Sequence, residues 1–245
     1  MAKKGLTPAQ LEQLRSFDTP TVCNVIELFA VRPQTAGYMD KRISACYPTL
    51  PPMVGYASTA MFRSSVDPQG GKSYGSLDEQ IEAFGELPGP PVVVFQDLDD
   101  PPVAATFGEV MCTSYRAFGA TGLITSGAGR DVEQVGSLDF PVFCDGVICS
   151  HGYPQILDVH RPVHVGGIVI RPGDLLHGDA NGVTTIPQEI ATEVGPVCTE
   201  LVDIEAGVID YCRDGKVTLD GYVKARRELV DNLNKLGKRL RKKKR

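Results

Sequence analysis

The sequence lacks the features that would place it in a membrane, in a disulfide-rich secreted class or in two domains. No apolar run approaches the roughly 18–20 residues that span a bilayer, and residues 1–8 carry two lysines with no apolar stretch behind them, unlike a secretory signal. The seven cysteines include no C-x-x-C pair, so we expect neither a disulfide framework nor a zinc site, and most should be buried. Because no internal repeat or long linker is visible either, we expect a cytoplasmic protein with one α/β domain over residues 1–245.

Positive charge is scarce except at the C-terminal end. The net charge is −5, yet residues 238–245 read K-R-L-R-K-K-K-R, so the rest of the chain is more acidic than the whole. An acidic body is a poor general binder of nucleic acid, and we expect none. We interpret the basic tail as a solvated, frayed end, with contact to a nucleic acid or a membrane surface as the alternative.

The middle of the chain has the most regular pattern. Apolar runs bounded by proline or glycine predict strands at residues 54–62, 91–95, 121–126 and 141–144. Helical spacing predicts helices at residues 109–118 and 131–137, with a loop at 96–108 and a second one at 63–76. The order β-α-β-α-β predicts a parallel sheet.

The two ends of the chain predict added helices. Thr7-Pro8 and Asp18-Thr19-Pro20 are typical helix starts, so we expect N-terminal helices within about 7–30. After residue 150 we expect a strand at 163–171, a turn at 172–174, short strands at 175–178 and 183–186, and a helix at 187–207. Leucines spaced by four, three and four residues predict a helix at 221–240, within a C-terminal helical extension of about 205–245.

The best candidate site lies at the carboxyl edge of the predicted sheet. Glu109 begins a helix after one strand, and Arg130 and Asp131 follow the next, so the topology brings the three residues together. The helix begins after Gly108, so the amides of Val110 and Met111 can bind a carboxylate without a bulky side chain before them.

The residue types in this cluster complement one another. Arg130 offers a planar fork to a carboxylate or keto oxygen, and Asp131 and Glu109 offer hard oxygen ligands to a Mg²⁺-like ion. The alternative is a surface salt bridge for Arg130 and Asp131 and a simple tight turn for Gly127-Ala128-Gly129. This stretch lacks the third glycine of a dinucleotide loop and the Lys-Ser/Thr of a phosphate loop.

The other polar candidates are better explained by structural roles than by chemistry. His177 and Asp179, in H-G-D-A-N-G, form a second candidate cluster, but an aspartate in such a turn usually serves turn hydrogen bonds. His151 and His160 could line a pocket, although a surface position is the simpler interpretation. Cys112 lies early in a helix, yet no histidine is tied to it and no G-x-S-x-G is present, so a thiol nucleophile is not favoured.

Four stretches resemble a known family, the RraA-like group of 4-hydroxy-4-methyl-2-oxoglutarate and 4-carboxy-4-hydroxy-2-oxoadipate aldolases and the regulator of ribonuclease E activity. They are residues 19–25, 108–111, 122–132, and 172–174 with 178–183. The aldolases share an acidic residue, twenty intervening residues and then Arg-Asp. Glu109, Arg130 and Asp131 reproduce that interval, with glutamate where the aldolases have aspartate. Asn24 stands where many relatives carry aspartate, so no role is transferred to it.

The resemblance implies a swivelling β/β/α three-layer fold in a homotrimer or homohexamer, with sites between subunits. Arg130 would bind an α-keto acid substrate, Asp131 would anchor Mg²⁺ or Mn²⁺ largely through water, and the amides of Val110 and Met111 would hold the pyruvyl carboxylate. Glu193 and Glu200 are candidate donors to a neighbouring subunit's site.

The implied activity is a class II pyruvate aldolase that also decarboxylates oxaloacetate. The alternative is a non-catalytic regulatory binding protein like the ribonuclease regulator, which lacks the acid after the arginine. Older labels in the family suggest a methyltransferase, but this sequence has no convincing glycine-rich cofactor loop.

Overall fold

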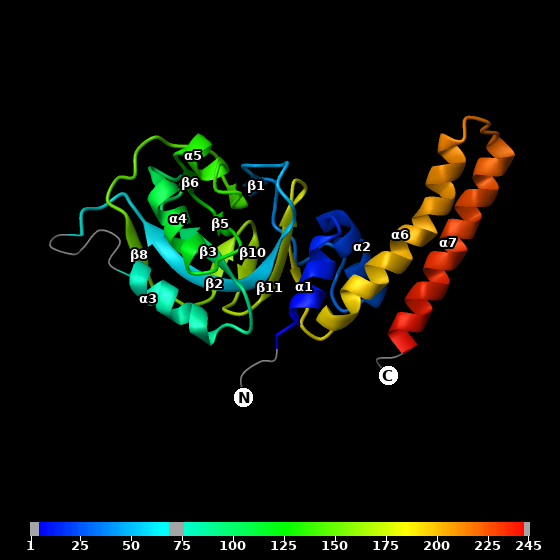
Figure 1. Ribbon diagram of the computed structural model, residues 1–245, viewed down its shortest axis with the longest axis horizontal. Coiled ribbons are helices and arrows are strands. Elements are labelled where there is room, and N and C mark those ends of the chain that lie inside the picture. Colours follow the sequence, from blue (N-terminus) through cyan, green and yellow to red (C-terminus); the bar gives the residue numbers. More distant parts are fainter. Residues whose placement is uncertain (1–4, 69–75, 243–245) are drawn as a thin grey trace.

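A mixed β-sheet with parallel strands at its centre organises the computed structural model, which describes residues 5–68 and 76–242 (Figure 1). Within these residues the sheet order is β1-β7-β5-β3-β2-β11-β12, and β8 also pairs with β2. The neighbours β2, β3, β5 and β7 are parallel, which confirms the predicted parallel core. The strands are β1 (Ser44–Ala45), β2 (Met53–Arg63), β3 (Pro91–Asp97), β5 (Leu123–Thr125), β7 (Val142–Cys144), β8 (Gln155–Leu157), β11 (Leu175–Asp179) and β12 (Gly182–Ile186).

The two faces of the sheet are covered by different layers. Val93 and Phe95 share a core with α4, where the rings of Phe95 and Tyr115 lie 6.3 Å apart. Val92 and Val94, which alternate with them along β3, belong to the core under the β9–β10 hairpin. The result is a β/β/α arrangement, as predicted. The covering elements are α3 (Leu77–Glu82), η1 (Ala83–Glu86), α4 (Glu109–Ala117), α5 (Val132–Gly136), β9 (Val163–Val165) and β10 (Ile168–Ile170).

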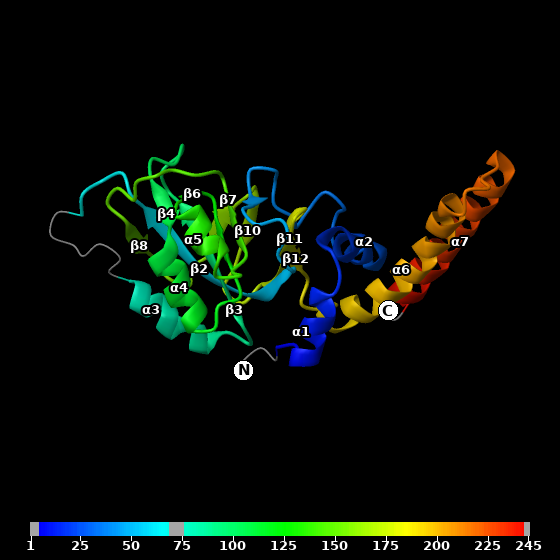
Figure 2. The same ribbon diagram turned by 45° about the horizontal axis from the view of Figure 1, so that its top comes forward.

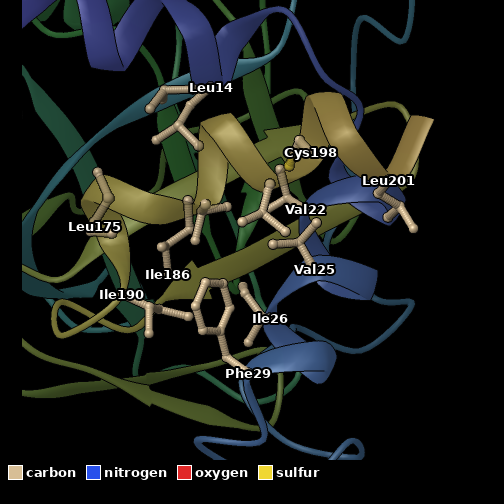
Figure 3. Close-up of a cluster of buried hydrophobic side chains, with 14 of the residues drawn as sticks. Leu14, Val22, Val25, Ile26, Phe29, Leu175, Ile186, Ile190, Cys198 and Leu201 are labelled. Carbon is tan, nitrogen blue, oxygen red and sulfur yellow. The ribbon is translucent and has the colours of Figure 1, made fainter. Parts of the chain in front are cut away.

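A third core lies beside the sheet, under α1 (Pro8–Arg15), α2 (Thr19–Phe29), α6 (Ala191–Arg213) and α7 (Leu219–Lys242). Figure 3 shows Ile26 and Phe29 of α2 close to Ile186 and Ile190. A capping box at Thr7 starts α1 and the Asp18 side chain caps α2, which confirms the predicted N-terminal helices. In Figures 1 and 2, α6 and α7 run side by side and project away from the sheet.

Several segments differ from the prediction. The strand expected at 163–171 is the β9–β10 hairpin, because Gly166 and Gly167 take φ values of +56° and +79° and reverse the chain. The loop expected at 96–108 contains β4 (Ala105–Phe107), and α6 begins later and ends later than expected. Of the loop at 63–76, residues 69–75 lie outside the described residues.

The basic C-terminal end is helical as far as residue 242, so our expectation of a frayed tail is wrong for residues 238–242. Leu240 is buried, and Arg239 donates to both carboxylate oxygens of Glu200 at 2.7 Å, which holds this turn against α6. Residues 243–245 lie outside the described residues. No helix in the described part of the chain is both long and apolar enough to cross a membrane.

Candidate active site

A small parallel sheet brings the two predicted site loops together. β4 pairs with β6 (Ala128–Gly129), with Ala105 opposite Ala128 and Phe107 opposite Gly129. The Arg130 amide extends this pairing by donating to the Phe107 carbonyl at 3.1 Å. Gly108 and Glu109 therefore lie next to Arg130 and Asp131, which confirms that the topology juxtaposes these two stretches.

The Asp131 carboxylate is directed at the start of α4. Its Oδ2 accepts a hydrogen bond from the Glu109 amide at 3.0 Å and lies 3.7 Å from Arg130 Nε. Asp131 holds the N-cap position of α5 with φ +55°, yet its side chain makes no capping bond to α5. A left-handed backbone is uncommon for a residue other than glycine. This conformation thus presents the carboxylate to the neighbouring helix instead of to its own.

Gly108 is the residue that makes room for this arrangement. A Cβ at this position would lie 2.5 Å from Asp131 Oδ2 and 3.1 Å from Arg130 Nε. Its backbone is extended, with φ −156°, so the backbone angle would permit a side chain, but a Cβ would crowd the Asp131 and Arg130 side chains. Gly108 was expected to leave the amides of the following residues open to a ligand. It also leaves room for the Asp131 carboxylate beside the start of α4.

The first turn of α4 offers backbone donors. Gly108 supplies no side-chain cap, and Asp131 takes only the Glu109 amide, so the amides of Val110 and Met111 have no side-chain acceptor within the described residues. The Val110 side chain is 80% exposed, whereas that of Met111 is buried and anchors the turn. A helix N-terminus with uncapped amides attracts a carboxylate.

The charged side chains around this turn are open to solvent in part. The Arg130 and Asp131 side chains are 31% and 37% exposed, and Glu109 is exposed. Among the described residues, neither Nη atom of Arg130 nor Oδ1 of Asp131 forms a hydrogen bond. The guanidinium fork and one carboxylate oxygen are thus available to a ligand.

The oxygen donors suit a divalent cation held largely by water. No group of three or more His, Cys, Asp or Glu side chains that could hold a metal occurs in residues 5–68 and 76–242. The described residues therefore contain no metal site in which protein side chains alone would surround the ion. One carboxylate oxygen of Asp131 with the nearby Glu109 fits an ion such as Mg²⁺, which keeps several waters and takes one or two carboxylates.

The second predicted cluster is structural. His177 is fully buried, and burial lowers its pKa. The neutral ring bridges the Thr19 hydroxyl and the Leu14 carbonyl, both at 3.0 Å. Asp179 accepts hydrogen bonds from the amides of Thr19 and Asn181, which joins the start of α2 to the β11–β12 turn. The turn interpretation of this cluster is confirmed.

The remaining candidates do not converge on the site. His151 is exposed and contacts the carbonyl of the next residue, and His160 contacts Ser58 and Glu86. Cys112 is fully buried, and desolvation raises its pKa, which opposes a role as a nucleophile. Glu200 is paired with Arg239 of its own chain. Glu193 lies in the first turn of α6.

Asp97 is a polar residue of this edge that the sequence analysis missed. It ends β3 and is 7% exposed, and burial raises its pKa to about 6. Its Oδ1 accepts the Asp99 amide at 3.0 Å, and it borders a cavity of about 220 Å³ that Arg42, Asp145 and His164 also line. The signal was present in the sequence, since Asp97 lies two residues after the buried apolar run that ends at Phe95, and a polar residue there marks the carboxyl end of a strand.

Comparison with known proteins gives one clear family. The model of the RraA-like family, described as Aldolase/RraA, matches residues 19–185. A protein of Halalkalibacterium halodurans named "Putative 4-hydroxy-4-methyl-2-oxoglutarate aldolase" is 39% identical over 85 residues, which is 34% of this chain and 40% of that protein. The chain thus spans less than half the length of this relative.

Solved structures share the fold. An uncharacterized protein of Pseudomonas syringae pv. tomato has a TM-score of 0.72 at 22% identity, covering 92% of this chain and 96% of that one. Streptomyces coelicolor RraAS2, described as an unusual member of the RNase ES inhibitor RraA protein family, has a TM-score of 0.65 at 19% identity, covering 82% and 96%. At these identities the likeness concerns the fold alone. The match of the family model over residues 19–185, more than half of the chain, shows that the chain belongs to the RraA-like family.

Proposed function

We propose that this chain is a divalent-metal-dependent lyase that cleaves an α-keto acid through a pyruvate enolate. The activity resembles that of a 4-hydroxy-4-methyl-2-oxoglutarate aldolase, with decarboxylation of oxaloacetate as a second reaction. The observation that carries the proposal is the position of the Asp131 carboxylate, 3.0 Å from the Glu109 amide at the start of α4 and beside Arg130. The aldolase names of relatives support the lyase class.

Each group in this cluster matches a part of an α-keto acid. The amides of Val110 and Met111 would bind the carboxylate at the positive end of α4. The Arg130 fork would orient the keto group and favour the negative charge that develops on its oxygen. These contacts would place the bond to be cleaved next to Asp131 and Glu109.

Asp131 would hold the divalent cation, Mg²⁺ or Mn²⁺, with water in its remaining positions and Glu109 close by. Bound there, the cation would act as a Lewis acid for the developing enolate. The same stabilisation of an enolate would serve both the retro-aldol reaction and decarboxylation, since both leave a pair of electrons on the carbon next to the keto group.

A coupled assay tests the proposal. The protein is incubated with Mg²⁺ and either 4-hydroxy-4-methyl-2-oxoglutarate or oxaloacetate, and pyruvate is followed through lactate dehydrogenase. We expect pyruvate that disappears with EDTA and returns with excess Mg²⁺, and Arg130→Ala should remove most of it. A metal-saturated protein that releases no pyruvate from either substrate would refute the proposed reaction.

The second candidate function is a regulatory binding protein, for which the fold of RraAS2 is the supporting observation. Asp131 favours the enzyme, because a contact-based inhibitor has no need for a carboxylate turned to a helix start beside an arginine. A homotrimer or homohexamer with sites between subunits and a cytoplasmic location remain part of the proposal. Sedimentation of the purified protein tests the assembly.

A further inference from the structure

Two cysteines that are far apart in the sequence face each other near the candidate active site. Cys46 follows β1 and Cys144 ends β7, and their Sγ atoms are 3.2 Å apart. The two strands are antiparallel, with Ser44 opposite Cys144, and the Cys46 amide continues the ladder by donating to the Val142 carbonyl. The thiols are therefore diagonal neighbours across two paired segments, held close by backbone hydrogen bonds.

The Cys144 thiol and the residue next to Cys46 are linked to opposite ends of the segment that carries Arg130 and Asp131. The Cys144 thiol donates to the Gly146 carbonyl at 3.1 Å, and the same carbonyl accepts the Gly129 amide at 3.0 Å. On the other side, Tyr47, next to Cys46, donates its hydroxyl to the Val132 carbonyl at 2.7 Å. Cys144 is thus linked through Gly146 to the start of the segment at Gly129, and Tyr47, the neighbour of Cys46, contacts its end at Val132.

The environment of the pair favours reaction between the two sulfurs. The hydrogen bond between the two thiols lowers the pKa of Cys144, aided by backbone groups of Gly146 and Gly129 and opposed by burial. The same hydrogen bond, together with burial, raises the pKa of Cys46. Cys46 is half-buried and Cys144 is buried, so Cys46 is the less buried member of the pair. A low-pKa thiol beside a second thiol is the arrangement that peroxides oxidise to a disulfide.

We propose that Cys46 and Cys144 form a redox modification site, which a peroxide closes to a disulfide, and that the closure displaces the segment from Gly129 to Val132. One thiolate attacks a peroxide oxygen, the O–O bond breaks, and the leaving hydroxide takes a proton to become water. The second sulfur then attacks the sulfenic sulfur, the S–O bond breaks, and a second water leaves. The two thiols lose two electrons and two protons, and hydrogen peroxide is reduced to two waters.

The displacement follows from the distances. A disulfide has an S–S length of about 2.05 Å, so the sulfurs must approach by about 1 Å from their separation of 3.2 Å. Closure also removes the S–H donor that Cys144 directs at Gly146, whose carbonyl holds Gly129. Both changes reach the backbone that sets the position of Asp131.

The remaining cysteines provide the controls. Cys149 and Cys212 are exposed, Cys23 is half-buried, and Cys112 and Cys198 are buried. Among the described residues, the short sulfur–sulfur contact is the one between Cys46 and Cys144. A Cys149→Ser/Cys212→Ser background therefore removes the exposed thiols that peroxide would oxidise without a resolving partner. Within that background, Cys46→Ser deletes one member of the pair, and Cys198→Ser is the matched control.

The test treats the full-length background protein with hydrogen peroxide and then alkylates and maps its peptides. We expect a linked peptide pair containing Cys46 and Cys144, a mass lower by two hydrogen atoms, and reversal by dithiothreitol. The linked pair should survive Cys198→Ser and vanish in Cys46→Ser. Free thiols at both positions after oxidation of the wild-type chain would overturn the proposal, whether or not the variants fold.

The effect on the site has its own readout. Amide hydrogen exchange of residues 127–132 should change in the oxidised protein and recover on reduction, and unchanged exchange in a fully linked protein would overturn the coupling. Oxidation should also lower the rate of pyruvate formation by about tenfold or more, an expectation that rests on the proposed function. A linked protein with altered exchange but no activity in either state would count against that function and not against the disulfide.

Discussion

Gly108→Ala is the substitution that probes the candidate site most selectively. The added Cβ would lie 2.5 Å from Asp131 Oδ2, whereas ordinary van der Waals contact begins near 3.4 Å. The carboxylate must therefore retreat by about 0.9 Å, which breaks its 3.0 Å contact with the Glu109 amide. A misplacement of about 1 Å can cost roughly 100-fold in rate, so we expect pyruvate formation to fall by about two orders of magnitude.

The fold should tolerate this change. The backbone of Gly108 is extended, and alanine adopts that conformation freely, so the free energy of unfolding should fall by no more than about 1 kcal/mol. Gly85→Ala is the matched control, because a Cβ at Gly85 meets no atom within 4 Å. The two variants are compared by kcat/KM and by urea unfolding. A Gly108→Ala protein with wild-type kcat/KM would refute the steric reasoning.

Three further predictions concern stability. Gly207→Ala, at an exposed position inside α6 with no atom within 4 Å of the new Cβ, should stabilise the protein by about 0.5–1 kcal/mol, and a lower melting temperature would contradict this. Tyr115→Phe leaves the buried Gln80 without the hydroxyl that donates to its Oε1 at 2.6 Å, so it should cost about 1–3 kcal/mol in urea unfolding; a neutral result would mean that the amide finds another donor. Burial raises the pKa of Asp97 to about 6. Between about pH 4 and about pH 6 the folded protein therefore keeps a proton on this carboxyl that the unfolded chain has lost. The contribution of Asp97 to the free energy of unfolding falls as the pH rises through that range. Asp97→Asn should remove this loss, and identical pH profiles of unfolding for the two proteins would contradict the assignment.

The parallel core was predictable because its sequence signals are local. Val92 to Phe95 form one apolar run, and such a run between turn residues specifies a strand buried on both faces. The strand order then follows from the β-α-β connections. The β9–β10 hairpin was missed because five of its six strand residues are apolar, so the stretch reads as one strand, and only the positive φ angles of Gly166 and Gly167 separate the two halves.

The neighbourhood of the site was predictable, but its geometry was not. Topology alone places Glu109 and Asp131 on one edge of the sheet. Sequence position would make Asp131 the cap of α5, and only the left-handed backbone at that residue turns its carboxylate to the Glu109 amide. The contact between Cys46 and Cys144 depends on the pairing of β1 with β7, which no local pattern encodes.

Expectations about the cysteines as a group were only partly met. We expected most of them to be buried, yet only Cys112, Cys144 and Cys198 are. The two exposed cysteines lie in a loop and near the end of α6, where no apolar periodicity constrains them. Burial of a small side chain is set by tertiary packing, so composition gives only its average.

The central claim is that Asp131 anchors a divalent cation next to the keto-acid site. Its most direct test is the dependence of pyruvate formation on Mn²⁺ concentration in the wild type and in Asp131→Asn, an exchange that keeps the shape of the side chain and removes its charge. We expect the wild type to saturate with Mn²⁺, and Asp131→Asn to need far more metal and to lose most of its kcat/KM. An Asp131→Asn protein with the wild-type Mn²⁺ dependence and activity would contradict the account.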